Sequence, residues 1–160
     1  MDATDFLKIF AWAMTPIGEL RLSIPLAIVD MGMPWYQALL LSLAGNMVPV
    51  LFLVLGLERI ARVLQSFPNP LGRLLAWRSE RLRRVHQERF RKYGAVLLVA
   101  LVAIPLPFTG AWTGSLAAWV FQVPARTAIP LIALGVLIAG TVVTALTVAG
   151  VQVSIFLAHR

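Results

Sequence analysis

Four long apolar stretches alternate with polar segments along the chain, and two of them are uninterrupted. Residues Pro34 to Leu57 and Thr127 to Leu157 are almost wholly hydrophobic. A helix rises about 1.5 Å per residue, so ~20 residues cross the ~30 Å hydrocarbon core of a bilayer. We therefore predict a membrane-spanning helix over each stretch. Pro34 fits the start of the first, because the first turn of a helix tolerates proline.

The other two apolar stretches, Phe6 to Val29 and Gly94 to Phe121, are interrupted near their centres by turn-forming residues. Each interruption leaves two arms of about ten residues, which reach only halfway across a bilayer. Irregular backbone at membrane depth is tolerated only where protein or water satisfies its polar groups. We therefore predict two re-entrant helical hairpins. The residues expected to break them are Pro16, Gly18, Pro25, Pro105, Pro107 and Gly110.

The two halves of the chain share an order of features that suggests an internal repeat. A shift of 92 positions places Gly18 on Gly110, and a shift of 90 positions places Pro34 on Pro124. An odd number of crossings between two copies would invert one relative to the other, as in transporters whose substrate site lies between inverted repeats. Chance similarity between apolar segments is the alternative explanation.

The predicted fold is an all-α integral membrane protein with a single membrane domain over residues 1–160. Two inverted repeats, about 4–57 and about 94–158, each consist of a re-entrant helical hairpin followed by a transmembrane helix. Residues 58–93 join them as a cytoplasmic, amphipathic, basic helix.

Composition and charge support a membrane location. Hydrophobic residues make up 59% of the chain and charged residues only 13%, against roughly 25% charged in soluble domains. The segment 58–93 holds ten basic and three acidic residues, which accounts for the whole net charge of +7. By the positive-inside rule this segment is cytoplasmic, and we expect a multi-pass protein of the inner or plasma membrane. The basic helix is expected to contact lipid headgroups rather than nucleic acid.

Candidate chemistry begins with Glu19 and Arg21, two opposite charges within the first apolar stretch. An ionisable group at membrane depth costs at least a few kcal/mol, so it should face protein or water and have a partner. Residues two apart on a helix point to different sides, so a direct ion pair needs a non-helical turn, or partners must come from the other hairpin. Burial disfavours a charged carboxyl, so we expect Glu19 to exchange protons. Arg21 would hold a phosphate or carboxylate.

Polar residues elsewhere extend this candidate site. Thr109, Trp112 and Thr113 follow the break in the second hairpin, where free amides near a half-helix N-terminus favour anions. A packed turn is the alternative there. Asn46 is polar within the first span, which a helix-to-helix hydrogen bond would also explain. The predicted substrate-binding residues are Glu19, Arg21, Ser23, Asn46, Thr109, Trp112 and Thr113.

Other chemistries lack the residues they need. The chain has no cysteine, and its two histidines, His86 and His159, show no metal-ligand spacing. No nucleotide-binding or hydrolase motif is present in the sequence. We therefore expect no catalytic residues, no metal and no cofactor, and a protein that is not an enzyme.

Four motifs carry a resemblance to a known family. They are ELRLSIP at residues 19–25, Gly45-Asn46 with Pro49, Tyr93-Gly94, and PLPFTGAWTG at residues 105–114. In this pattern nearly the whole chain resembles the putative small multi-drug export protein family. That family is more distantly similar to the DedA-like membrane proteins, whose fold pairs two re-entrant hairpins with spanning helices and whose members are associated with moving polyprenyl phosphate or other lipids. The resemblance implies transport.

The expected function is a secondary transporter or flippase for an amphiphilic, phosphate-bearing substrate that binds between the two hairpins, with coupling to protons. Proton-driven export of small cationic drugs is the alternative within transport. A membrane scaffold that does not transport, with the basic helix as its working surface, is a third hypothesis. Two spans and two hairpins are few to enclose a pathway, which favours a homodimer.

Overall fold

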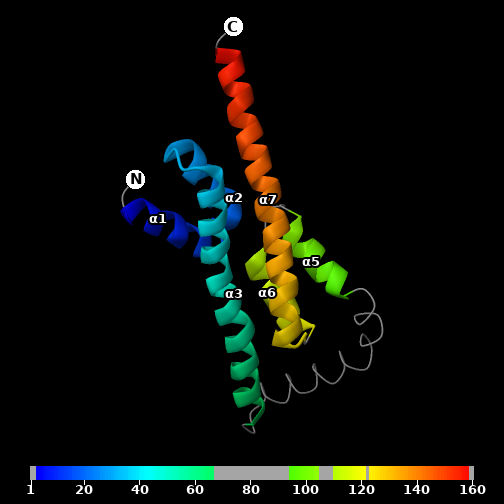
Figure 1. Ribbon diagram of the computed structural model, residues 1–160. Coiled ribbons are helices and arrows are strands. Elements are labelled where there is room, and N and C mark those ends of the chain that lie inside the picture. Colours follow the sequence, from blue (N-terminus) through cyan, green and yellow to red (C-terminus); the bar gives the residue numbers. More distant parts are fainter. Residues whose placement is uncertain (1–2, 67–93, 105–109, 122, 159–160) are drawn as a thin grey trace.

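A computed structural model describes residues 3–66, 94–104, 110–121 and 123–158, and this part of the chain is helical without any strand (Figure 1). Most of the predicted basic helix, together with Thr109, Pro105 and Pro107, lies outside the described residues.

Two long helices, α3 (Trp35–Ser66) and α7 (Ala125–Ala158), lie side by side and run in opposite directions (Figure 1). Their segments Trp35–Leu57 and Ala125–Ser154 are long and apolar enough to cross a membrane. The most apolar window of each is only 39% buried inside the protein, whereas the core helix of a soluble protein would be mostly enclosed. These two helices confirm the two predicted uninterrupted apolar helices.

Four short helices form two helix–turn–helix units. The first hairpin consists of α1 (Ala3–Met14) and α2 (Glu19–Pro25), and the second of α5 (Ala95–Ala103) and α6 (Ala111–Val120). Figure 1 shows α2 rising beside the upper part of α3, while α6 descends beside its lower part. The ends of the hairpins therefore meet halfway along the long helices.

At Pro25 the α-helix ends without a turn, and the helix continues in another form. Pro16 and Gly18 do lie in the turn between α1 and α2, but Pro25 is the last residue of α2, and the chain continues as a π-helical segment, η1 (Leu26–Asp30). Proline only removes its own N–H and crowds the preceding turn. Wider i→i+5 bonding accommodates the change, as in the bond of 3.2 Å from the amide of Met31 to the carbonyl oxygen of Leu26.

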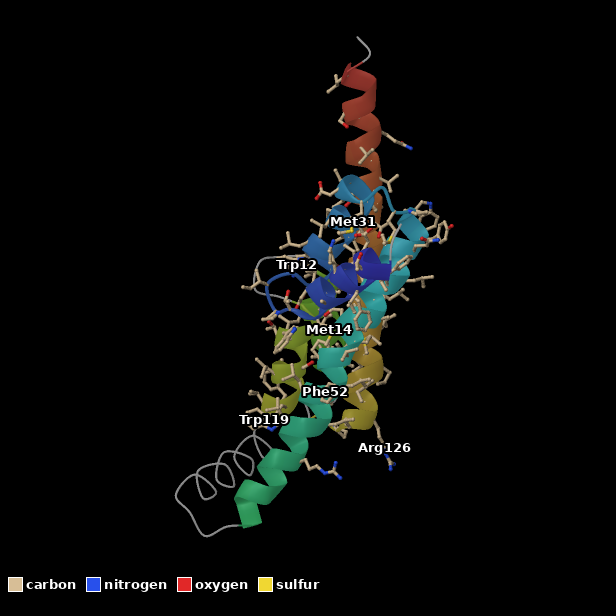
Figure 2. The ribbon with its side chains drawn as sticks, turned by 90° about the vertical axis from the view of Figure 1, so that its left-hand side faces the viewer. Trp12, Met14, Met31, Phe52, Trp119 and Arg126 are labelled. Atoms are coloured by element: carbon tan, nitrogen blue, oxygen red, sulfur yellow. The ribbon has the colours of Figure 1, made fainter. Side chains whose placement is uncertain are left out.

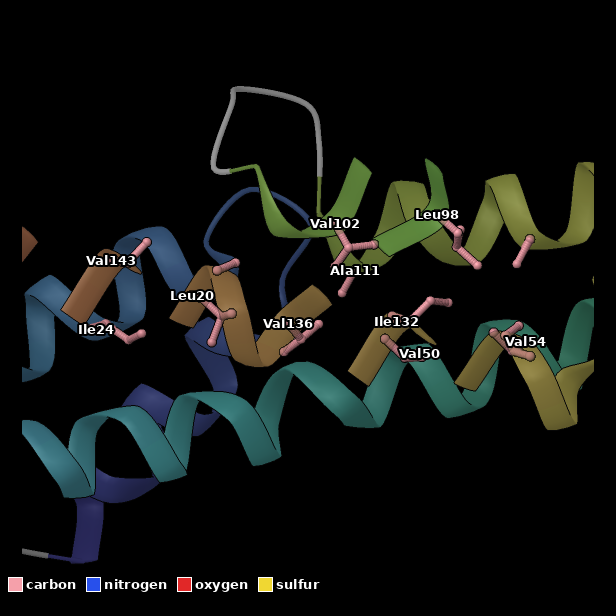
Figure 3. Close-up of a cluster of buried hydrophobic side chains, with 13 residues drawn as sticks. Leu20, Ile24, Val50, Val54, Leu98, Val102, Ala111, Ile132, Val136 and Val143 are labelled. Carbon is pink, nitrogen blue, oxygen red and sulfur yellow. The ribbon is translucent and has the colours of Figure 1, made fainter. Parts of the chain in front are cut away.

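The hydrophobic core lies where the two hairpins meet the two long helices (Figure 3). All outer faces remain apolar as well: Leu7 is 68% exposed, Phe52 76% and Leu146 66% (Figure 2). Apolar surface of this extent is unfavourable in water and is what lipid tails cover. The buried cluster comprises Leu20, Ile24, Val50, Val54, Leu98, Val102, Ala111, Ala118, Ala128, Ile132, Val136, Ala139 and Val143.

Candidate functional site

The carboxylate of Glu19 lies at the N-terminus of a helix from the other hairpin. Glu19 is the first residue of α2 and is only 8% exposed. The backbone amide of Trp112 donates a hydrogen bond to its Oε1 at 3.3 Å, and the amide of Ala111 donates to the same carboxyl. The first amides of a helix have no partner within it and carry partial positive charge, so an anion is stabilised there. Glu19 therefore caps α6 from outside.

Gly110 makes this contact sterically possible. It precedes α6 with a φ of +148°, a conformation that side-chain-bearing residues rarely adopt. A Cβ at this position would collide with the carboxylate of Glu19. Gly110 therefore both interrupts the hairpin and leaves the space that the carboxylate of Glu19 occupies.

The backbone of Glu19 is strained. Its φ is +40°, the one positive φ of a non-glycine residue in the described part of the chain. The left-handed region costs an L-residue roughly 1–2 kcal/mol. Such strain persists only where surrounding contacts hold it, and it gathers at binding and switching sites. The interactions around Glu19 include its contact with α6, the bond of 3.1 Å from its amide to the carbonyl oxygen of Thr15, and the bond from Ser23 to its own carbonyl oxygen.

A second hydrogen bond links the hairpins in the same direction, again with Trp112 as the donor. The indole Nε1 of Trp112 donates to the backbone carbonyl oxygen of Met14 at 3.2 Å. Met14 ends α1 and lies about halfway along the molecule in Figure 2. The first hairpin thus supplies an acceptor to the start of α6, and the second supplies a donor to the end of α1.

Ser23 lies one turn further along α2 and is fully buried. Its hydroxyl donates to the carbonyl oxygen of Glu19 at 2.7 Å, and its Oγ lies 2.9 Å from the Oγ of Ser42 on α3, with which it shares a hydrogen bond. Ser42 was missed from the sequence. Its position four residues before Asn46, on the same face of one helix, is the signal that could have identified it.

Asn46 is the most conspicuous polar residue of α3. It is 1% exposed, and its Oδ1 has no hydrogen-bond partner among the described residues. Pro49 stands inside the same helix and has no N–H to donate to the carbonyl of Gly45, four residues earlier. At this level of α3, the Oδ1 of Asn46 and the carbonyl oxygen of Gly45 are therefore both available as hydrogen-bond acceptors.

The structure therefore brings together several of the predicted site residues. Glu19 and Trp112 are in contact, and Ser23 follows one turn later. Arg21 is half-buried and interacts electrostatically with Glu19, while Thr113 belongs to the first turn of α6. Thr109 lies outside the described residues. In the described ranges no group of histidine, aspartate and glutamate side chains could hold a metal ion.

Comparison with known proteins gives one match. A family model described as "Putative small multi-drug export protein" matches residues 19–142, more than half of the chain. The match begins at Glu19 and includes its contact with Trp112, whereas Met14 lies just before the matched residues. No curated protein and no solved structure matches the chain.

Proposed function

The chain belongs to the putative small multi-drug export protein family, and from that premise we propose that it is a membrane transporter whose substrate binds where the two hairpins meet. The buried carboxylate of Glu19 on the N-terminus of α6 carries this proposal. A charge at such depth is costly unless it has a partner or a function. Here the carboxylate of the first hairpin is bonded to α6 of the second, and transport would require the two hairpins to move relative to each other. A contact of this kind can open and close without unfolding either hairpin.

We also propose the arrangement that makes alternating access possible. The two hairpins are re-entrant, and the two halves of the chain form inverted repeats. Helices α3 and α7 each follow one hairpin and run in opposite directions, which supports the inversion. In transporters of this plan, half-helix ends meet at the substrate site near the bilayer midplane. Rocking of one repeat against the other would then expose the site to either side.

The substrate that fits best is an amphiphile with a phosphate or similar anionic group, and its movement is coupled to protons. The amides that begin α6 suit an anion. The carboxylate of Glu19 occupies the position that the anionic group of the substrate would take. Arg21 supplies a permanent positive charge nearby. Protonation of Glu19 would release these amides for the substrate. The likeness to DedA-like proteins, which rests on sequence motifs alone, agrees with a lipid-type substrate.

One observation favours a second candidate, proton-driven export of small cationic drugs. The free Oδ1 of Asn46 is an acceptor without a donor among the described residues. An ammonium group would satisfy it and would also be attracted to the carboxylate of Glu19.

Transport by purified protein in vesicles with an imposed pH gradient tests the proposal. Glu19→Gln keeps the size of the side chain but cannot ionise, so proton-dependent transport should be lost. Arg21→Ala separates the two substrates: uptake of a fluorescent phospholipid analogue should fall, whereas binding of a cationic dye should improve if the cationic substrate is the true one.

Thr144→Val serves as the control, because Thr144 is buried on α7 and its hydroxyl bonds only within its own helix in the described structure. Its transport should equal that of the unmodified protein. Unchanged pH dependence in Glu19→Gln would refute the role of Glu19. Normal behaviour of both the Glu19 and the Arg21 variant would favour the scaffold hypothesis.

A further inference from the structure

The side-chain oxygen of Asn46, Oδ1, has no hydrogen-bond donor among the described residues. A buried polar atom without a partner costs about 1–3 kcal/mol, and native interiors keep few of them. Asn46 Oδ1 is such an atom within the described structure. A donor that is present in only one state of the protein would explain why this acceptor is retained.

The packing of α2 against α3 brings Asn46 to the depth of Glu19. Ser23 and Ser42 share a hydrogen bond of 2.9 Å between these two helices. The helices run in opposite directions, because α2 rises and α3 descends (Figure 1). Four residues make about one helical turn. One turn below the serine contact, α2 therefore presents Glu19 and α3 presents Asn46 at the same level.

The two protonation states of a carboxyl need different partners. An ionised carboxylate only accepts hydrogen bonds, and the amides of Ala111 and Trp112 donate them. A protonated carboxyl carries an O–H that must be donated, and backbone amides cannot accept it. Asn46 Oδ1 can.

We propose that Asn46 is the positioning residue that accepts the proton-bearing carboxyl of Glu19, so that this carboxyl moves between the N-terminus of α6 when ionised and Asn46 when protonated. The inference rests on the proposed function, in which Glu19 takes up a proton. It goes further by assigning the second position of the carboxyl. The positive φ of Glu19, +40°, is the kind of backbone conformation that gathers at switching sites.

Few other charges compete for the carboxyl. Arg21 on α2 acts on it directly. On α1, Asp5 and Lys8 pair with each other at 3.4 Å in the first half of the helix. Asp30 ends η1, the ionisable residues of α3 (Tyr36, Glu58, Arg59 and Arg62) lie near its ends, and Arg126 lies in the first turn of α7. Helices α5 and α6 carry no ionisable side chain.

The movement has a direct consequence for binding. When the carboxyl lies against Asn46, the first amides of α6 are open to the anionic group of the substrate. When a proton leaves, Glu19 returns and competes with that group. Proton loss and substrate release are thereby coupled at the N-terminus of α6. Asn46 determines how completely the protonated carboxyl of Glu19 leaves that position.

Two spectroscopic measurements on the purified protein in lipid nanodiscs test this inference without any transport assay. The infrared carbonyl band of protonated Glu19, identified by its loss in Glu19→Gln, should lie at the frequency of a hydrogen-bonded acid. In Asn46→Leu, which keeps the branched shape of the side chain but removes the acceptor, the band should move to higher frequency. Thr144→Val, which removes a buried hydroxyl on α7 that bonds within its own helix, is the control and should leave the band in place.

The second measurement uses the wild-type chain, so it holds even if Asn46→Leu fails to fold. The side-chain amide resonance of Asn46 should shift with pH at the same midpoint as the Glu19 band and should show no such midpoint in Glu19→Gln. A Glu19 that titrates while the Asn46 resonance stays constant overturns this inference and leaves the proposed transport intact. A Glu19 that never titrates overturns both the inference and the proton coupling.

Discussion

The carboxylate of Glu19 stabilises the start of a helix to which it does not belong. A charge at a helix terminus contributes about 0.3–1 kcal/mol at exposed sites and up to ~2 kcal/mol where it is partly buried. The left-handed backbone of Glu19 costs a similar amount, roughly 1–2 kcal/mol. Burial of the charge also opposes the contact, so the stabilisation by the helix terminus is set against both the strain and the desolvation of the carboxylate.

Substituting Gly110 tests how closely this contact is fitted. Gly110→Ala places a Cβ against the Glu19 carboxylate and forces an unfavourable φ, so we expect it to destabilise the protein by about 1–3 kcal/mol. Thermal unfolding in detergent measures the effect.

Gly56→Ala is the matched control, because Gly56 lies in α3 with open space around its Cα. This substitution should stabilise the helix by roughly 0.5–1 kcal/mol, since alanine favours helices over glycine. Equal unfolding temperatures for the two variants would contradict the close fit at Gly110.

At the scale of elements, each long helix has a glycine where the first helix of its own hairpin packs closely against it. A Cβ on Gly45 of α3 would lie 2.7 Å from the carbonyl oxygen of Phe10 on α1, and one on Gly135 of α7 would lie 2.6 Å from the Cβ of Val102 on α5. The two glycines are 90 positions apart, as are the first residues of the long helices, Trp35 and Ala125. Small residues permit such close approach of helices in membranes.

A double-mutant cycle on α5 and α7 tests this packing. Gly135→Ala alone should destabilise by about 1–3 kcal/mol through overpacking, and Val102→Ala alone should also destabilise by leaving a cavity. Together they should cost somewhat less than their sum, because Val102→Ala removes the Cγ1 that the new methyl group would meet at 2.9 Å, while the Cβ at 2.6 Å stays. Strict additivity in thermal unfolding would argue against direct contact between the two positions.

The sequence was sufficient to predict elements that depend on local patterns. The apolar runs located both long helices, and Pro16 and Gly18 located the first turn. Helix α3 extends to Ser66, past the predicted Leu57, because a helix can continue where its side chains become polar. The form of the break at Pro25, a change from α-helix to π-helix rather than a turn, could not be predicted, because several kinds of bonding accommodate proline's missing N–H. The capping of α6 by Glu19 joins residues 93 apart, and no local pattern encodes such a contact.

At the scale of the whole molecule, apolar side chains face outward on both long helices and both hairpins. Even Ile17, in the turn between α1 and α2, is 85% exposed. A membrane is the environment that covers these faces, and the proposed re-entrant, inverted arrangement predicts that the two hairpin turns are reached from opposite sides.

Cysteine labelling tests the arrangement, since the chain contains no cysteine of its own. Single cysteines at positions 17 and 108, one in each interrupting segment, should react with a membrane-impermeant reagent from opposite sides of the membrane. Leu20→Cys is the control and should remain unlabelled, because Leu20 is 3% exposed. Labelling of both positions from the same side would refute inverted hairpins.

The two apolar segments of the long helices differ in length, with 23 residues in Trp35–Leu57 and 30 in Ala125–Ser154. At about 1.5 Å per residue they span roughly 35 and 45 Å, against ~30 Å of hydrocarbon. Such mismatch is relieved by tilting, or by local thickening of the bilayer. The longer helix must tilt more, so bilayer thickness controls the angle between the two helices and the spacing of the hairpins packed on them. We therefore expect lipid chain length to alter how the two hairpins meet.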